Sequence, residues 1–165
     1  MQTPVLPAAC TDREGRAFSV RPFATGDREP LDRFYDAFDP KRAAQGLPPE
    51  GRARLDRWLD RILAGGTHLM VERDGALVGH AMLMPTQRPG VSEYAIFLAK
   101  EERGRGVGTA VNRLAAQVAR ILGLDRLWLS VETHNRPAVR SYEKAGFRFR
   151  PGTVNTPEVE MELPL

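Results

Sequence analysis

The chain has 165 residues, of which 42% are hydrophobic, and it carries a formal net charge of +3 and a single cysteine, Cys10. This length favours one domain over residues 1–165, while the lone cysteine excludes an internal disulfide and favours a reducing, cytoplasmic compartment. Basic and acidic residues are interleaved and no run of 18 apolar residues occurs, so we expect neither a nucleic-acid partner nor a membrane span.

The first half of the chain predicts two helices between strands. Residues 1–11 are punctuated by proline and predict a loose arm or an edge strand, and the next segment, 18–21, alternates like a strand. Asp27 is a candidate N-cap for a first helix, because apolar residues follow it at helical spacing. Residues 39–49 have helix breakers at both ends, and a second amphipathic helix covers 55–63.

The second half predicts a hairpin and then strands that alternate with helices. The hairpin joins strands 68–72 and 76–84, and a strand over 93–99 leads into a glycine-rich turn and a third helix. A strand over 127–133 and a fourth helix follow, and residues 147–150 and 159–163 are the last strands. The order β-α-α-β-β-β-α-β-α-β-β predicts a mixed α/β sheet with helices on its faces.

The turn between the strand and the third helix, Arg103-Gly104-Arg105-Gly106-Val107-Gly108, is the most informative motif. Glycines let a ligand approach the backbone closely, and free N–H groups together with the helix dipole favour an anion at a helix N-terminus. The two arginines add charge-assisted donors. The turn therefore predicts an anion site, with a pyrophosphate as the favoured ligand.

The spacing of the glycines decides which pyrophosphate ligand fits. The chain lacks the dinucleotide pattern G-x-G-x-x-G at this turn, and it lacks the Walker pattern G-x-x-x-x-G-K-[ST]. What remains, R-x-x-G-x-G, resembles the acyl-coenzyme A loop of the GNAT superfamily of N-acetyltransferases. A second motif downstream, which runs from Val131 through Asn135 and Tyr142 to Gly146-Phe147, is similar to another signature of that family. The resemblance covers about residues 18–163.

The resemblance implies a mixed, mostly antiparallel central sheet of about six to seven strands with four helices. It implies that two central strands, 93–99 and 127–133, are parallel and splay apart, and that the arm of acetyl-CoA enters between them and pairs with backbone groups of Leu98 and Ala99. It places the pyrophosphate on the glycine turn and the first residue that follows. The residues concerned are Arg103, Gly104, Arg105, Gly106, Val107, Gly108 and Thr109.

The resemblance also implies catalytic roles for this chain. Tyr142 matches a tyrosine that gives a proton to the leaving thiolate, although a helix tyrosine also packs simply on a core. Asn135 matches a residue near the cofactor, and an N-cap role is physically as good. Glu93 is the candidate general base, acting through water, with His80 and Glu132 as weaker alternatives. The three histidines lack metal-ligand spacing, so we expect no metal.

The implied activity is transfer of an acetyl group from acetyl-CoA to a primary amine by direct transfer in a ternary complex. In the family, the first two helices and their connection shape the acceptor pocket, which here points to residues 35–55, including Tyr35, Phe38 and the 45–49 turn. The acceptor is open between a small-molecule amine and a protein lysine or N-terminal amine. A non-catalytic acyl-CoA sensor stays an alternative, and relatives of this kind are often homodimers.

Overall fold

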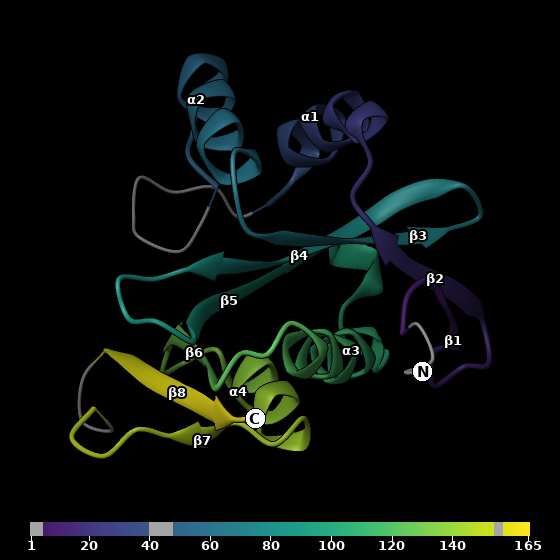
Figure 1. Ribbon diagram of the computed structural model, residues 1–165. Coiled ribbons are helices and arrows are strands. Elements are labelled where there is room, and N and C mark those ends of the chain that lie inside the picture. Colours follow the sequence, from purple (N-terminus) through teal and green to yellow (C-terminus); the bar gives the residue numbers. More distant parts are fainter. Residues whose placement is uncertain (1–4, 40–47, 154–156) are drawn as a thin grey trace.

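The computed structural model describes residues 5–39, 48–153 and 157–165, and its centre is an eight-stranded sheet in the order β1-β2-β3-β4-β5-β6-β8-β7 (Figure 1). The strands are β1 (Ala8–Thr11), β2 (Ala17–Pro22), β3 (Thr67–Arg73), β4 (Ala76–Pro85), β5 (Val91–Leu98), β6 (Arg126–Glu132), β7 (Arg148–Phe149) and β8 (Glu158–Pro164). The expected mixed, mostly antiparallel α/β architecture is confirmed. The expected number of strands was low, because residues 8–11 pair with β2 as an edge strand.

In the part of the chain that the structure describes, four helices cover the two faces of the sheet, as predicted. Figure 1 shows α1 (Arg28–Ala37) and α2 (Arg52–Leu63) over one face, and α3 (Val107–Ile121) and α4 (Arg136–Lys144) over the other. Alternate strand residues face opposite sides of a sheet, so the two helical layers bury different residues of the same strands. Met70 and Met82 pack with α1 and α2, whereas Leu69 and Val71 belong to the core that α3 closes.

The strands β5 and β6 form a parallel pair that ends early. They pair only along Val91–Glu93 and Arg126–Trp128, whereas the other pairings within the described residues are antiparallel. Beyond Glu93, β5 continues its pairing with β4, and beyond Trp128, β6 continues with β8. The two central strands therefore part in the middle of the sheet, and the residues after them lead into α3 and α4. Among the described residues, no helix is long and apolar enough to cross a bilayer.

Candidate active site

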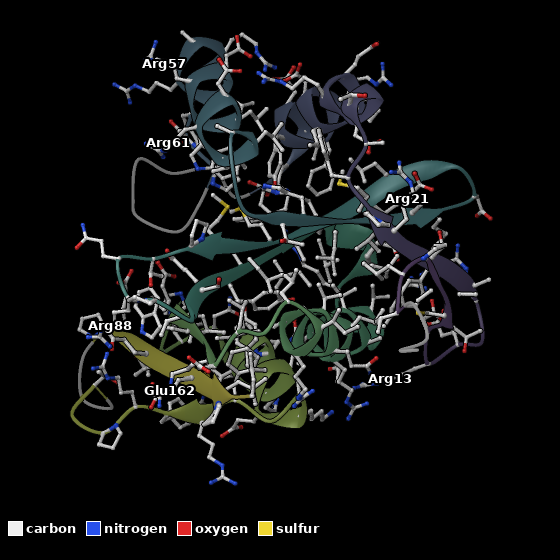
Figure 2. All side chains as sticks on the ribbon, viewed as in Figure 1. Arg13, Arg21, Arg57, Arg61, Arg88 and Glu162 are labelled. Atoms are coloured by element: carbon white, nitrogen blue, oxygen red, sulfur yellow. The ribbon has the colours of Figure 1, made fainter. Side chains whose placement is uncertain are left out.

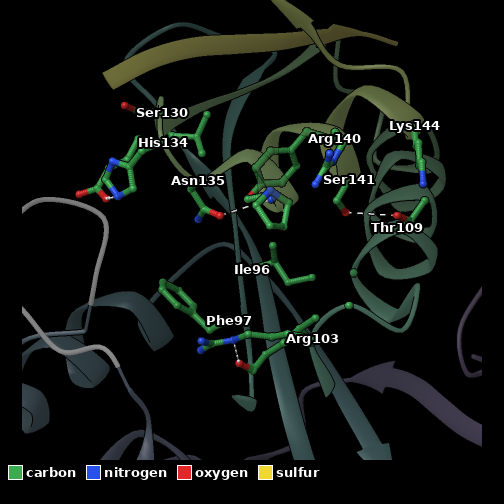
Figure 3. Close-up of a pocket in the computed structure, with 18 of the residues that line it drawn as sticks. Ile96, Phe97, Arg103, Thr109, Ser130, His134, Asn135, Arg140, Ser141 and Lys144 are labelled. Carbon is green, nitrogen blue, oxygen red and sulfur yellow. Dashed lines mark hydrogen bonds and ion pairs between the residues drawn. The ribbon is translucent and has the colours of Figure 1, made fainter. Parts of the chain in front are cut away.

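A cleft of about 1180 Å³ opens where β5 and β6 part, between the start of α3 and the start of α4 (Figure 3). The structure brings together most of the site residues predicted from the sequence. The predicted residues that line the cleft are Glu93, Leu98, Arg103, Gly104, Gly106, Gly108, Thr109, Asn135 and Tyr142. Ala99, Arg105 and Val107 were also predicted and do not line it.

The glycine turn presents backbone N–H groups at the start of α3. Gly104 and Gly106 have φ of 74° and 85°, a region that other residues occupy at a cost, and Gly106 is the N-cap of the helix. The amides in the first turn of a helix have no partner within the helix, and the Gly106 cap position supplies no side chain to bind them. A Cβ atom at Gly108 would lie 3.3 Å from Ser141 Oγ, so α3 packs closely against α4 at this position. These bare amides fit an anionic group such as a diphosphate.

The two arginines of the turn hold protein groups with their side chains. Arg103 donates from Nε to the Leu98 carbonyl at 3.1 Å and from Nη2 to the Asp39 carbonyl at 2.7 Å, and its guanidinium lies 5.4 Å from the centroid of the Phe38 ring. Arg105 donates to the Glu14 carboxylate at 2.7 Å. The charge of Arg105 is therefore compensated by Glu14, whereas Arg103, which donates to two neutral carbonyls, keeps its positive charge at the turn.

Along β5, the backbone N–H and C=O groups of every second residue point into the gap between β5 and β6. Ala99 donates its N–H to the Val78 carbonyl of β4 at 2.9 Å, and the Gly90 carbonyl accepts from Arg126 at the start of β6 at 3.2 Å. Because backbone groups of a strand alternate between its two edges, the even-numbered residues Ile96 and Leu98 face the gap. We expected the backbone of Ala99 to face the gap, but its N–H is bonded to β4. Ile96 lines the cleft and was not predicted, because the edge of the strand that a residue faces depends on which strand it pairs with.

Tyr142 lies in α4 with its ring in the core and borders the cleft. The residue is 9% exposed, and its ring packs edge-on against Tyr94 with 6.3 Å between centroids. Burial raises the pKa of Tyr142 to about 12, so the phenol keeps its proton at neutral pH. A protonated hydroxyl at the cleft surface is suited to donate a hydrogen bond or a proton to a developing anion.

A buried polar network ties α4 to α3 beside Tyr142. The Tyr94 hydroxyl donates to Asn112 Oδ1 at 2.7 Å, and Asn112 Nδ2 donates to Ser141 Oγ at 3.0 Å. Ser141 Oγ also lies 3.3 Å from Thr109 Oγ1, a contact that is visible in Figure 3. Sequence reasoning missed Asn112 and Ser141, because the network joins three elements that are far apart in the chain.

Carboxylates line the part of the cleft that faces β6 and β8. Glu93 pairs with Trp128 across the parallel ladder and is exposed to the cleft, yet partial burial raises the pKa of its carboxyl. Glu132 lies 3.0 Å from His134 Nε2, and Glu158 and Glu160 of β8 also line the cleft. Glu132 thus remains a candidate base beside Glu93.

His80, the other alternative base, is a structural residue. Its side chain is fully buried and does not line the cleft. His68 Nε2 lies within 2.9 Å of two carbonyls, those of Ile62 and Gly65, so this nitrogen carries the hydrogen and His68 Nδ1 accepts from His80 Nε2 at 3.0 Å. His80 Nδ1 then accepts from the Tyr35 hydroxyl at 2.6 Å. Burial, followed by the charge of His68, lowers the pKa of His80 to about 3, which keeps it neutral.

Asn135 caps α4, as its position predicted. Its Oδ1 accepts from the Ala138 N–H at 3.4 Å, and the residue also borders the cleft (Figure 3). On the acceptor side, Tyr35 is part of the core and Phe38 lines the cleft. Residues 45–47 of the predicted acceptor turn lie outside the described residues.

Comparison with known proteins gives one consistent result. Residues 31–147 match the model of the acetyltransferase (GNAT) family. Streptothricin acetyltransferase of Streptomyces lavendulae is 37% identical over 86 residues, which are 50% of this chain and 44% of the relative. Mycothiol acetyltransferase of Sanguibacter keddieii is 33% identical over 137 residues, which are 74% of this chain and 41% of the relative. The chain therefore spans less than half the length of these two relatives.

Solved structures share the fold at lower sequence identity. The GNAT domain of S. lividans PAT superposes with a TM-score of 0.80 over 100% of both chains at 21% identity. A spermidine N-acetyltransferase from Vibrio cholerae, solved with CoA and spermine, gives a TM-score of 0.68 over 89% of this chain and 95% of its own at 20% identity. Because the family model matches well over half of the chain, the protein belongs to the GNAT family of acetyltransferases.

Proposed function

We propose that this chain is an acetyl-CoA-dependent N-acetyltransferase that transfers the acetyl group directly to a primary amine within a ternary complex. The observation that carries the proposal is the cleft itself. It joins an uncapped helix N-terminus, the gap between two parting parallel strands and the buried phenol of Tyr142. Membership of the acetyltransferase family supports the same proposed activity.

The residues present fit an acyl-CoA donor. The amides at the start of α3 would hold the diphosphate, and the gap-facing backbone groups of Ile96 and the N–H of Leu98, whose carbonyl accepts from Arg103, would pair with the amides of the pantetheine arm as an added strand does. The donor supplies the thioester, and the chain supplies its orientation along β5. Asn135 contributes a side-chain amide at the same edge of the cleft.

In this proposal Tyr142 stabilises the leaving group and Glu93 carries the proton transfer. A thiol has an ordinary pKa of about 8.5, whereas the pKa of Tyr142 is about 12, so the phenol remains protonated and donates a hydrogen bond to the thiolate as it leaves. Glu93 accepts a proton from the incoming amine through water, and its raised pKa strengthens it as a base. The two side chains reach the cleft from different elements, α4 and β5.

The favoured acceptor is a small molecule that carries an ammonium group. Both curated relatives described above are named for small molecules, streptothricin and mycothiol. The carboxylates of Glu93, Glu132 and Glu158 border the part of the cleft that faces β6 and β8, and there they favour a cationic acceptor over an anionic one.

Calorimetry followed by an acceptor screen tests the proposal. We expect the protein to bind acetyl-CoA and to release free thiol with at least one member of a panel of primary amines that includes a lysine peptide. Mass spectrometry would identify the acetylated product. Binding without turnover on any acceptor would favour the sensor alternative, and acetylation of the peptide alone would favour a protein acceptor. Folded protein that shows no heat of binding with acetyl-CoA or CoA would overturn the proposal.

A further inference from the structure

A residue far from the glycine turn in sequence lies directly against it. Arg13 belongs to the turn between β1 and β2, and its N–H donates to the Arg105 carbonyl at 2.9 Å. Its side chain passes close to Gly106, where an added Cβ atom would lie 3.1 Å from Arg13 Cγ and 3.2 Å from Arg13 Nε. Arg13 is exposed and lines the cleft, and Figure 2 shows it on the α3 side of the sheet. The first turn of the chain thus forms one wall of the anion site.

The turn that carries Arg13 is held by buried charges. Asp12 Oδ1 accepts the N–H groups of Glu14 at 2.9 Å and Arg16 at 3.0 Å, which closes the turn on itself. Asp12 Oδ2 accepts from Arg73 at 2.9 Å, and the Asp12 side chain is 0% exposed. Arg73 also binds Glu102, which immediately precedes Arg103 in the chain. The β1–β2 turn and the glycine turn are therefore anchored to the same guanidinium.

The guanidinium of Arg13 makes no hydrogen bond to another described residue, in contrast to those of the turn's own arginines. Arg103 donates to the Leu98 and Asp39 carbonyls, which leave its charge uncompensated, and Arg105 pairs with the Glu14 carboxylate. Within the described residues, no carboxylate forms an ion pair with Arg13. A guanidinium without a carboxylate partner, fixed beside uncapped helix amides, is a strong candidate to bind a phosphate.

We propose that Arg13 is a phosphate-binding residue of the acyl-CoA site and supplies a guanidinium that, unlike those of Arg103 and Arg105, is not engaged by hydrogen bonds to other described residues. The proposal rests on the proposed function, because it takes acyl-CoA to be the ligand. Two phosphate groups of CoA have the required chemistry, the diphosphate and the 3′-phosphate. Both groups carry anionic oxygens that accept charge-assisted hydrogen bonds from a guanidinium.

The experiment compares CoA binding by calorimetry in wild-type protein and four variants. We expect Arg13→Ala to raise the Kd for CoA about tenfold or more, and Arg13→Lys to recover part of that loss. Arg16→Ala is the matched control, because Arg16 is an exposed arginine of the same turn that does not line the cleft, and it should leave the Kd within about twofold. Arg105→Ala should cost less than Arg13→Ala, because Arg105 is engaged by Glu14. Equal melting temperatures of the Arg13 and Arg16 variants would show that the turn is intact.

A comparison of CoA with 3′-dephospho-CoA distinguishes which phosphate group Arg13 binds. A penalty of Arg13→Ala that persists with 3′-dephospho-CoA assigns Arg13 to the diphosphate, and a penalty that disappears assigns it to the 3′-phosphate. Wild-type Kd in the Arg13→Ala variant, or an equal loss in Arg16→Ala, would overturn the inference while the proposed function stands. Absence of CoA binding in the wild-type protein would remove the proposed function itself, so the two failures are distinguishable.

Discussion

Arg73 and Glu102 form an ion pair almost without solvent, with 2.7 Å between Nη2 and Oε2 and with side chains that are 5% and 7% exposed. Arg73 ends β3, and Glu102 lies in the short segment between β5 and the glycine turn. The same guanidinium binds Asp12 at 2.9 Å and the Ala17 carbonyl at 3.0 Å. One buried cation thus joins the first hairpin, the centre of the sheet and the entry to the anion site.

Replacing Arg73 should strongly destabilise the fold. Arg73→Ala leaves two buried carboxylates without their partner, so we expect the melting temperature to fall by on the order of 10 °C. Arg126→Ala is the control, because Arg126 pairs with Glu162 at 2.9 Å and its side chain is 44% exposed, and the change should be about 2 °C or less. Differential scanning calorimetry of both variants checks the difference. Equal shifts would mean that the buried pair contributes no more than the exposed one.

Removing the Tyr142 hydroxyl should slow the chemistry while donor binding is retained. In the Tyr142→Phe variant we expect kcat to fall about 100-fold, because the hydrogen bond to the leaving thiolate is lost. The ring still fills the core, so the Kd for acetyl-CoA and the melting temperature should stay near their wild-type values. Single-turnover thiol release with an accepted amine measures the step. An unchanged rate would remove Tyr142 from the mechanism.

Glu93 should set the acidic limb of the pH–rate profile. A general base acts only when it is deprotonated, so kcat/KM falls as the pH falls through the pKa of Glu93, and burial moves this limb to higher pH than for an ordinary glutamate. Glu93→Gln should remove the limb and lower kcat/KM about 100-fold at neutral pH. Glu132→Gln, which alters the second cleft carboxylate, is the comparison. A large loss in that variant with little change in Glu93→Gln would transfer the role of base to Glu132.

His80 should make the stability depend on pH just below neutrality. Its pKa is about 3 in the folded protein and about 6.5 when unfolded, so the unfolded state binds more protons between these values. The free energy of unfolding should therefore be highest above about pH 6.5 and fall by up to about 1.4 kcal/mol per pH unit as the pH decreases below it. Urea unfolding between about pH 7 and pH 5 measures the slope, which His80→Gln should flatten. A slope that survives this substitution would point to other groups.

Local signals in the sequence determined the elements and the centre of the anion site. The alternating residues of β8, the cap Asn135 and the glycines of the turn act over a few residues, so each predicts its own element without knowledge of the rest. The order of these elements predicted a mixed sheet with helices on its faces, and the family resemblance carried by two motifs implied that Gly106 and Tyr142 serve one site, where the structure places both at one cleft. The number of strands was underestimated because the edge strand β1 is short and lies next to prolines.

Tertiary structure alone decided which groups are available at the site. Arg103 and Arg105 stand in the motif, but Arg103 donates to two backbone carbonyls and Arg105 pairs with Glu14. Arg13, whose guanidinium makes no hydrogen bond to another described residue, reaches the cleft from near the start of the sequence. Ile96 replaces Ala99 at the gap because pairing with β4 fixes which edge each residue faces. Hydrogen bonds, ion pairs and burial depend on partners that are distant in sequence, so a pattern of neighbouring residues carries no record of them.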